Sequence, residues 1–219
     1  MASLSLRLRA VLDAVGRCDR LADVCSDHAQ LALAAVELGV AHRAVAIELR
    51  AAPLDQARRL LRQSPLAGRV LLVRGAGLQA VHRVEVVVMA GVGGDLAAEL
   101  LAEAGRVGAE RVIVQPNRHG REVRAWARGA GFQLDAEQVV AEGERLHLVL
   151  TFARRPGRDP AYGAHAEEVE LLLGPRLLAS SGASERLFLQ REQGRLRRLQ
   201  GYRPEFVAAL RVLEGRQSG

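Results

Sequence analysis

Two carboxylates follow two short apolar segments near the start of the 219-residue chain. Asp23 closes the segment Leu21–Ala22, and Glu48 closes the next one, at residues 44–47. Each segment has the length of a buried strand, and the residues between them have a helical pattern. A parallel strand pair with a crossover helix brings both acids to the sheet edge where open α/β proteins bind ligands. A carboxylate at the second strand end can bind both ribose hydroxyls of an adenosine-type cofactor.

The turn after the first strand is acidic and contains no glycine. Its residues 24–28 are Val-Cys-Ser-Asp-His, whereas a dinucleotide site has the pattern G-x-G-x-x-G at this place. Acids in this turn would repel a pyrophosphate but suit a cation, and S-adenosylmethionine carries an ammonium and a sulfonium group. The charge pattern therefore favours S-adenosylmethionine over a nicotinamide dinucleotide.

Structural roles would also explain several residues of this turn. Asp27 could simply cap the following helix, and His28 could bond to Asp27 rather than to a cofactor or substrate. Cys25 has no nearby base in the sequence, so we interpret it as a small packing residue. Asp23 and Glu48 are harder to explain in this way, because both end strands at the binding edge.

Two later strand ends carry further candidate groups. The glycine-rich segment 90–94 follows a strand predicted at 85–89, and glycine there would let a planar base approach the backbone. A tight turn into a helix would also need these glycines. The amides of Gln115 and Asn117 end another strand, where they could bond a base edge or stabilise the turn.

A regular alternation of strands and helices positions these groups. Periodicity predicts helices at residues 4–15, 28–38, about 53–63, 95–103 and 119–128. It predicts strands at residues 20–24, 44–47, 69–73, 85–89, 111–114, 132–140 and 146–152. No helix separates the last two strands, so they pair antiparallel. The fold class is therefore α/β, a Rossmann-like parallel sheet with an antiparallel hairpin at its end.

A helical region follows the segment Arg154–Gly157, which marks a boundary. Helices are predicted at residues 166–178, 185–199 and 204–213. The break at 201–204 would let the last two fold back as a hairpin. We expect a cofactor-binding domain at residues 1–155 and a helical domain at residues 156–219.

The helical region carries a cluster of positive charge. Residues 186–203 contain six arginines and only one acid, Glu192. The arginines are Arg186, Arg191, Arg195, Arg197, Arg198 and Arg203. They could form a phosphate-binding face for RNA, although a solvated helix face has the same pattern. All 31 basic residues are arginine, which codon bias could produce. Aromatic residues make up only 3%, so we expect phosphate and shape contacts rather than base stacking.

Composition argues against several classes of protein. The only cysteines, Cys18 and Cys25, form no CxxC pair, so neither a disulfide framework nor a metal site is expected. The segment 1–9 alternates leucine with serine and arginine and lacks the apolar core of a signal peptide. The apolar segments are too short to span a bilayer. We expect a cytoplasmic protein with no membrane partner, and a monomer is favoured.

Four linked motifs resemble the bacterial tRNA adenine-22-N1 methyltransferases. They lie at residues 22–29, 46–48, 90–94 and 114–117, in the order and spacing of that family. The segments Asp159–Tyr162 and Leu173–Pro175 resemble the linker of the family, so the likeness covers residues from about 5 to 180.

This resemblance implies a class I S-adenosylmethionine-dependent fold with coiled-coil-like C-terminal helices. It implies methylation of N1 of an adenine in the D-arm region of tRNA. The turn from Asp23 would hold the methionine end, Glu48 the ribose, and residues 75–77 the adenine of the cofactor, while residues 91–94 would border the target base. The implied cofactor-binding residues are Asp23, Cys25, Ser26, Asp27, His28, Glu48, Leu49, Gly75, Ala76, Gly77, Ala90 and Gly91.

The chain departs from the family pattern at two positions. The family usually has an acid where Ala76 stands, and this acid can accept a bond from the adenine amine of the cofactor. It also usually has glycine where Cys25 stands. The C-terminal region, which would contact the tRNA, is shorter than expected for the family.

Methylation at adenine N1 needs positioning more than a strong base, because the N1 lone pair is already available. N1 lies on the pairing edge, so the base must be unpaired or flipped out. The product is cationic, and the candidate groups near it are Asn117, the backbone of Gly91 and His28. Two alternatives stay open: a methyltransferase of this fold with another substrate, and an RNA-binding protein that has lost its cofactor.

Overall fold

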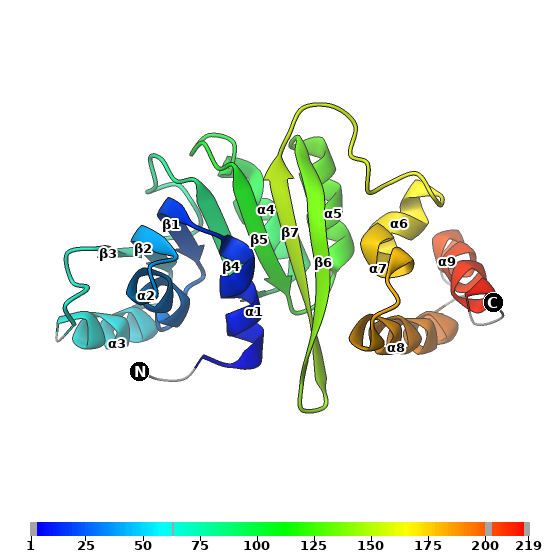
Figure 1. The fold of residues 1–219 in the computed structure, drawn as a ribbon, viewed down its shortest axis with the longest axis horizontal. Helices are drawn as coiled ribbons and strands as arrows, with labels where there is room; N and C mark the ends of the chain where they lie inside the picture. The colour runs from blue at the N-terminus through cyan, green and yellow to red at the C-terminus, as the bar shows by residue number, and fades with distance from the viewer. Residues whose placement is uncertain (1–3, 63, 200–202, 217–219) are drawn as a thin grey trace.

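The computed structural model describes residues 4–62, 64–199 and 203–216, and its elements follow the predicted alternation (Figure 1). The strands are β1 (Cys18–Val24), β2 (Ala41–Glu48), β3 (Val70–Arg74), β4 (Val86–Val92), β5 (Arg111–Pro116), β6 (Phe132–Glu142) and β7 (Arg145–Arg154). The helices are α1 (Leu6–Val15), α2 (Gln30–Glu37), α3 (Ala51–Arg62), α4 (Gly94–Leu100), α5 (Gly120–Gly129), α6 (Glu167–Leu173), α7 (Pro175–Ala179), α8 (Ala183–Leu199) and α9 (Pro204–Gly215). A short 3₁₀ helix, η1 (Leu101–Glu103), follows α4.

The strands form one sheet in the order β3-β2-β1-β4-β5-β7-β6. The first five strands in this order are parallel, and β7 is antiparallel to both β5 and β6. The predicted Rossmann-like sheet with its terminal antiparallel hairpin is therefore confirmed. In register, Val24 of β1 lies beside Ile47 of β2 and Met89 of β4, so the carboxyl ends of these strands meet at one edge.

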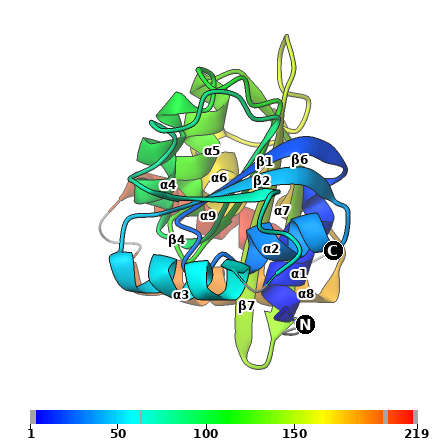
Figure 2. The same ribbon diagram turned by 90° about the vertical axis from the view of Figure 1, so that its left-hand side faces the viewer.

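Helices cover both faces of the sheet, with α1, α2 and α3 on one face and α4 and α5 on the other (Figures 1 and 2). Alternate residues of β4 serve the two layers: Val86 and Val88 pack toward α1 and α2, while Val87 and Met89 pack toward α4 and α5. This explains why the strand is almost purely apolar. No helix among the described residues is long and apolar enough to cross a bilayer.

Several predicted boundaries are wrong, with physical reasons. The strand predicted to end at Met89 continues to Val92, because a bulge at Gly91 lets Ala90 and Val92 stay paired with β5. The helix predicted from His28 begins only at Gln30, since the preceding turn needs a left-handed backbone at Ala29. The helix predicted at 166–178 is broken into α6 and α7 at Gly174, whose φ is 94°.

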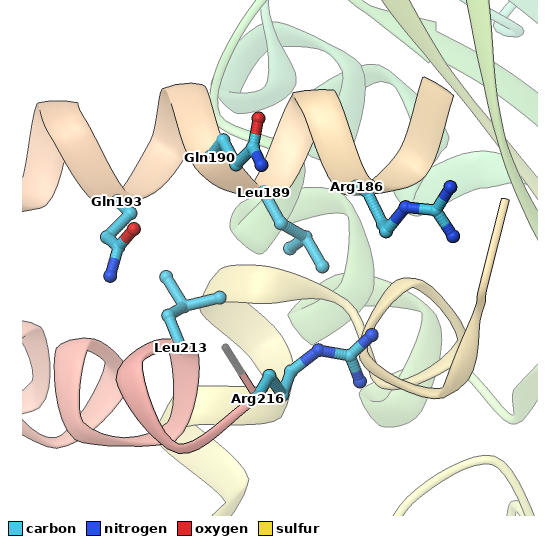
Figure 3. Close-up of a pocket in the computed structure, with 6 residues that line it drawn as sticks. All are labelled: Arg186, Leu189, Gln190, Gln193, Leu213 and Arg216. Atoms are coloured by element: carbon cyan, nitrogen blue, oxygen red, sulfur yellow. The ribbon is translucent and has the colours of Figure 1, made fainter. Parts of the chain in front are cut away.

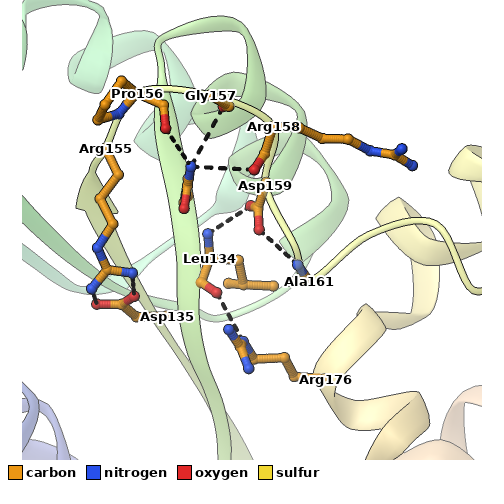
Figure 4. Close-up of polar contacts among 10 residues, drawn as sticks. Leu134, Asp135, Arg155, Pro156, Gly157, Arg158, Asp159, Ala161 and Arg176 are labelled. Carbon is orange, nitrogen blue, oxygen red and sulfur yellow. Dashed lines mark hydrogen bonds and ion pairs between the residues drawn. The ribbon is translucent and has the colours of Figure 1, made fainter.

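The segment that leaves the sheet after β7 is held against β6 (Figure 4). The side-chain amide of Gln133 donates to the carbonyls of Pro156, Gly157 and Arg158 at 3.1–3.4 Å. Asp159 accepts hydrogen bonds from the amides of Leu134 and Ala161, at 2.7 and 2.9 Å. The segment at the predicted boundary is therefore fixed to β6 by hydrogen bonds.

A buried ion pair joins the C-terminal helices to the sheet. Arg124 of α5 and Glu137 of β6 lie 2.6 Å apart, and their side chains are 1% and 0% exposed. Arg124 also donates to the carbonyl of Leu171, and Glu137 accepts from the amides of Arg176 and Leu177. Apolar residues of α6 to α9 belong to the same core cluster as the α4–α5 side of the sheet.

Helices α8 and α9 pack against each other, as the predicted hairpin requires. Leu189 and Leu213 lie between them beside a small cavity of about 90 Å³ (Figure 3). Of the turn predicted between the helices, residues 201 and 202 lie outside the described residues.

The ion pair makes Gly174 a sensitive position. A Cβ there would lie 2.6 Å from Arg124 Nη2 and from the Glu137 carboxylate, on a backbone with a φ of 94°. We predict that Gly174→Ala lowers the free energy of unfolding by at least about 2 kcal/mol, as measured by urea denaturation. Gly129→Ala is the control, because a Cβ at Gly129 meets nothing within 4 Å. Equal effects of the two substitutions would contradict this role of Gly174.

Candidate functional site

The groups predicted at the strand ends come together at the carboxyl edge of the sheet. Backbone hydrogen bonds tie the connecting loops to each other: Ser26 donates to the Ile47 carbonyl at 3.0 Å, and Gly75 donates to the Glu48 carbonyl at 3.2 Å. The loops after β1, β2 and β3 therefore form one continuous rim.

Asp23 is a buried carboxylate, only 2% exposed, at the end of β1. Its Oδ2 accepts hydrogen bonds from the Ser26 hydroxyl at 2.5 Å and from the Ala32 amide at 3.3 Å. No arginine or histidine of the described residues forms an ion pair with it. Burial raises the pKa of Asp23 to about 6, so its charge is poorly compensated within the protein.

Glu48, 4% exposed, is surrounded by hydrogen-bond donors. Oε1 accepts from the backbone amide and the Nε of Arg50, at 2.9 and 3.0 Å, and Oε2 accepts from the Asp27 amide at 3.0 Å. Burial works to raise the pKa of Glu48, but the hydrogen bonds from Arg50 and Asp27 outweigh it and lower the pKa. Each carboxylate oxygen has two lone pairs, and the three donors occupy three of these four, so one lone pair on Oε2 remains free.

The turn between β1 and α2 has an unusual backbone. Cys25, Asp27 and Ala29 have φ values of 58°, 52° and 56°, a left-handed conformation that residues other than glycine rarely adopt. Cys25 packs against the core, and burial raises the pKa of its thiol, as expected of a packing residue.

Asp27 does not cap α2, so that interpretation is wrong. The N-cap residue is Ala29, which has no capping side chain, and the Asp27 carboxylate instead binds Arg50 Nη2 at 2.9 Å. His28 Nε2 lies 3.7 Å from Asp27, too far for a hydrogen bond. His28 Nδ1 is buried and has no hydrogen-bond partner among the described residues, while the His28 side chain as a whole is 34% exposed.

The loop after β3 requires glycine at one position. Gly77 has a φ of 68°, and a Cβ there would lie 3.0 Å from Leu100. Ala76 stands between Gly75 and Gly77 and provides no side-chain acceptor. Leu49, at the end of β2, is 60% exposed and can cover a planar group at this rim.

Asn117 and Gly91 lie side by side across the ends of β4 and β5. The Asn117 side chain donates to the Gly91 carbonyl at 2.7 Å, and its backbone amide donates to the Val92 carbonyl at 2.8 Å. Gln115 is fully buried and accepts from the Gly91 amide at 3.0 Å, so it stabilises the turn rather than facing a base. Asn117 is exposed, and Ala90 forms part of the strand below it.

Sequence patterns missed four polar side chains at this edge. Arg7 of α1 donates to the Gln115 side chain at 2.7 Å, although 108 residues separate them. Asp95 and His119 form a hydrogen-bonded pair that lowers the pKa of Asp95. Arg50 is the only one with a local signal, because it follows Glu48 by two positions.

The six arginines of the helical region do not share one face. Arg195 and Arg203 line a cavity of about 580 Å³ that also contains Asn117. Arg186 lines the small cavity between α8 and α9. Arg191 donates to the Glu144 carbonyl at 2.8 Å, and Arg197 pairs with Glu214 at 3.1 Å. Arg198 completes the set in the last turn of α8.

The edge suits a ligand that carries both positive charge and hydroxyl groups. A poorly compensated carboxylate lies at the end of β1, a carboxylate with a free lone pair lies at the end of β2, and the turn after β1 carries the partly exposed imidazole of His28. An adenosine-type ligand with a cationic end fits this donor and acceptor pattern. At the ends of β4 and β5, the Gly91 carbonyl and the Asn117 amide provide dipoles for a second, planar group.

Comparisons with known proteins agree with this architecture. Residues 4–150 match the family model of a methyltransferase domain. The chain is similar to the tRNA (adenine(22)-N(1))-methyltransferase of Bacillus subtilis, with 34% identity over 185 residues, which is 82% of this chain and 77% of the relative.

Two solved structures extend the comparison over nearly the whole chain. The crystal structure of the B. subtilis M1A22 tRNA methyltransferase has a TM-score of 0.85 and 27% identity, covering 100% of this chain and 97% of that one. The Streptococcus pneumoniae protein Sp1610, solved in complex with S-adenosyl-L-methionine, has a TM-score of 0.85 and 28% identity, covering 97% and 99%.

The raised pKa of Asp23 predicts a measurable cost to stability. The carboxyl is neutral in both states well below its ordinary pKa of 3.8. Between pH 3.8 and about 6 the unfolded state gives up this proton before the folded state does, so the folded state loses stability, and the full penalty is present above about pH 6. Asp23→Asn should therefore increase the free energy of unfolding above pH 7 by about 3 kcal/mol, with no difference near pH 3. Urea denaturation between pH 3 and pH 8 measures this difference.

Asp13→Asn, on the exposed surface of α1, serves as the control and should change stability little at any pH. A constant difference between Asp23→Asn and the parent across the pH range would show that burial of the charge is not the cause.

Proposed function

Because the chain belongs to the tRNA (adenine(22)-N(1))-methyltransferase family, we propose that it uses S-adenosylmethionine to methylate N1 of adenine 22 in tRNA. The observation that carries this proposal is the pair of buried carboxylates, Asp23 and Glu48, at the carboxyl edge of a methyltransferase sheet. When bound, S-adenosylmethionine supplies a methyl group activated by its sulfonium charge.

Asp23 and His28 would bind the methionine end of the cofactor. A cationic ligand favours the ionised form of Asp23, so binding relieves the cost of burying this carboxylate. The partly exposed imidazole of His28 would offer a further polar contact. Glu48 would accept hydrogen bonds from the ribose hydroxyls, while Leu49 and residues 75–77 would enclose the adenine.

Asn117 and Gly91 would face the target base. The hydrogen bond between them fixes the orientation of both groups. Positive charge develops on the adenine ring as N1 is methylated, and an oriented carbonyl dipole stabilises this charge without transferring a proton. A strong base is not required, because N1 reacts through its own lone pair. These residues therefore position and stabilise the base.

The tRNA substrate accounts for the basic helical region, where arginines would contact phosphates. It also implies that the protein acts in the cytoplasm. A monomer remains our expectation, and we infer two functional regions, the cofactor-binding domain at residues 1–155 and the helical domain at residues 156–219.

A labelled-methyl assay tests the reaction. With tritiated S-adenosylmethionine and bacterial tRNA, the parent protein should produce labelled 1-methyladenosine, as identified by nucleoside analysis. Glu48→Gln should weaken cofactor binding about tenfold or more in calorimetry, because a charged hydrogen-bond acceptor is lost. Glu37→Gln, on the exposed end of α2, should bind normally.

The outcomes of this assay separate the alternatives. A different labelled nucleoside would overturn the adenine-N1 assignment, and labelling of protein or small molecules without tRNA would indicate another substrate. Undetectable cofactor binding by the parent would favour an RNA-binding protein that has lost its cofactor.

Arg50 should compete with the cofactor for Glu48. Its guanidinium occupies a lone pair of Glu48 and also binds Asp27, and the Arg50 side chain is 67% exposed. We predict that Arg50→Ala binds S-adenosylhomocysteine roughly two- to fivefold more tightly than the parent, the scale of an exposed ion pair. Added salt should narrow this difference, because it screens the competing pair.

Arg58→Ala is the matched control, since Arg58 pairs with exposed Asp55 on α3 and touches no strand end. Weaker binding by Arg50→Ala would instead mean that Arg50 holds Glu48 in its binding orientation.

A further inference from the structure

A sizeable cavity lies between the sheet and the C-terminal helices. Its volume is about 580 Å³, within the range of about 300–1,000 Å³ typical of ligand pockets. One wall comes from β7 and the start of α5, and the opposite wall comes from α8 and α9, which stand beyond the β6 edge (Figure 1). Asn117 and His119 lie at the end nearest the strand ends.

The helical wall of this cavity is aromatic. Phe188 of α8 and Phe206 of α9 line it, although the chain has only four phenylalanines. Both rings pack against the core on one side and are only partly buried. Among the described residues, the aromatic pairs join Trp126 to Phe132 and Phe152, and neither pair involves Phe188 or Phe206. Because both of these rings line the cavity and are only partly buried, part of each ring is open to a planar group within it.

Arginines lie beside these rings with donors to spare. Arg195 uses Nε and Nη2 on a single oxygen of Glu192, at 2.9 and 2.7 Å. Arg203 and Arg121 approach the same carboxylate, Glu205, at 3.6 and 3.8 Å, beyond hydrogen-bond distance. A guanidinium has five N–H donors, so each can still bind a phosphate.

We propose that this cavity receives an unpaired nucleotide of the tRNA substrate, next to the target adenine along the strand. Its base would stack on Phe188 and Phe206, and its phosphate would bind Arg195 and Arg203. The target base must leave its pair to expose N1, so a second site for its neighbour holds the strand open. This inference rests on the proposed function and differs from the expectation of phosphate and shape contacts rather than base stacking.

Fluorescence of a modified tRNA tests the stacking directly. The probe is a tRNA with 2-aminopurine in place of the nucleotide on either side of adenine 22. The parent protein should quench one of the two probes, because stacking on an aromatic ring quenches 2-aminopurine. Phe188→Leu and Phe206→Leu keep an apolar side chain for folding but lose the ring. Each should reduce the quenching and raise the KM for tRNA roughly tenfold, as the loss of one stacked base predicts.

Matched variants separate stacking from general damage. Phe188→Trp keeps an aromatic ring at this position, so it should quench the probe where Phe188→Leu does not. Leu187 is exposed on the same helix outside the cavity, so Leu187→Ala should behave as the parent. Arg195→Gln should weaken tRNA binding more than Arg211→Gln, on the exposed face of α9. Affinity for S-adenosylhomocysteine should be unchanged in all of these variants.

Two results would overturn the inference while leaving the proposed function intact: no quenching by a parent protein that makes 1-methyladenosine, or full quenching and normal KM in both leucine variants. Conversely, ring-dependent quenching by a protein that makes no 1-methyladenosine would support the cavity and refute the proposed reaction.

Discussion

The buried ion pair between Arg124 and Glu137 constrains the arrangement of the whole molecule. Removing two charges from water costs several kcal/mol for each ion, on the order of the total stability of a domain. Here the cost is partly offset, because Arg124 donates to the Leu171 carbonyl and Glu137 accepts from the amides of Arg176 and Leu177. A shift of α6 or α7 would break these hydrogen bonds and leave buried polar groups of the ion pair unsatisfied. The pair therefore fixes α6 and α7, which lead into α8 and α9, relative to the sheet.

The carboxylate of Asp23 is treated differently by the fold. Glu137 receives an arginine and two backbone amides, whereas Asp23 receives a hydroxyl and one long amide contact. The proposed roles account for this contrast, because a structural charge is stable when the protein satisfies it, whereas a charge that binds a ligand is satisfied by the ligand. Burying an unsatisfied acid costs free energy. This cost and the location at a strand end together indicate a binding site.

The sequence predicted the parts of the structure that depend on local periodicity. Strand ends follow from apolar segments of strand length, so Asp23 and Glu48 could be assigned to one edge before the structure. The contact of Arg7 with Gln115 and the pairing of Arg124 with Glu137 depend on how distant segments pack, and no local pattern records them. The separation of Arg195 from Arg186 could not be predicted either, because charge counting ignores which side of a helix each residue occupies.

Three features of the cofactor edge weaken binding in the proposed arrangement. Ala76 offers no acceptor to an adenine amine, Arg50 occupies a lone pair of Glu48, and Cys25 keeps a left-handed backbone that family members usually give to glycine. Each of these reduces the hydrogen bonding or the preorganisation available to a neutral adenosine. The attraction that remains is electrostatic, between the poorly compensated Asp23 and a cationic methionine end. The edge is therefore suited to discriminate by charge, binding the sulfonium form more strongly than its neutral thioether product.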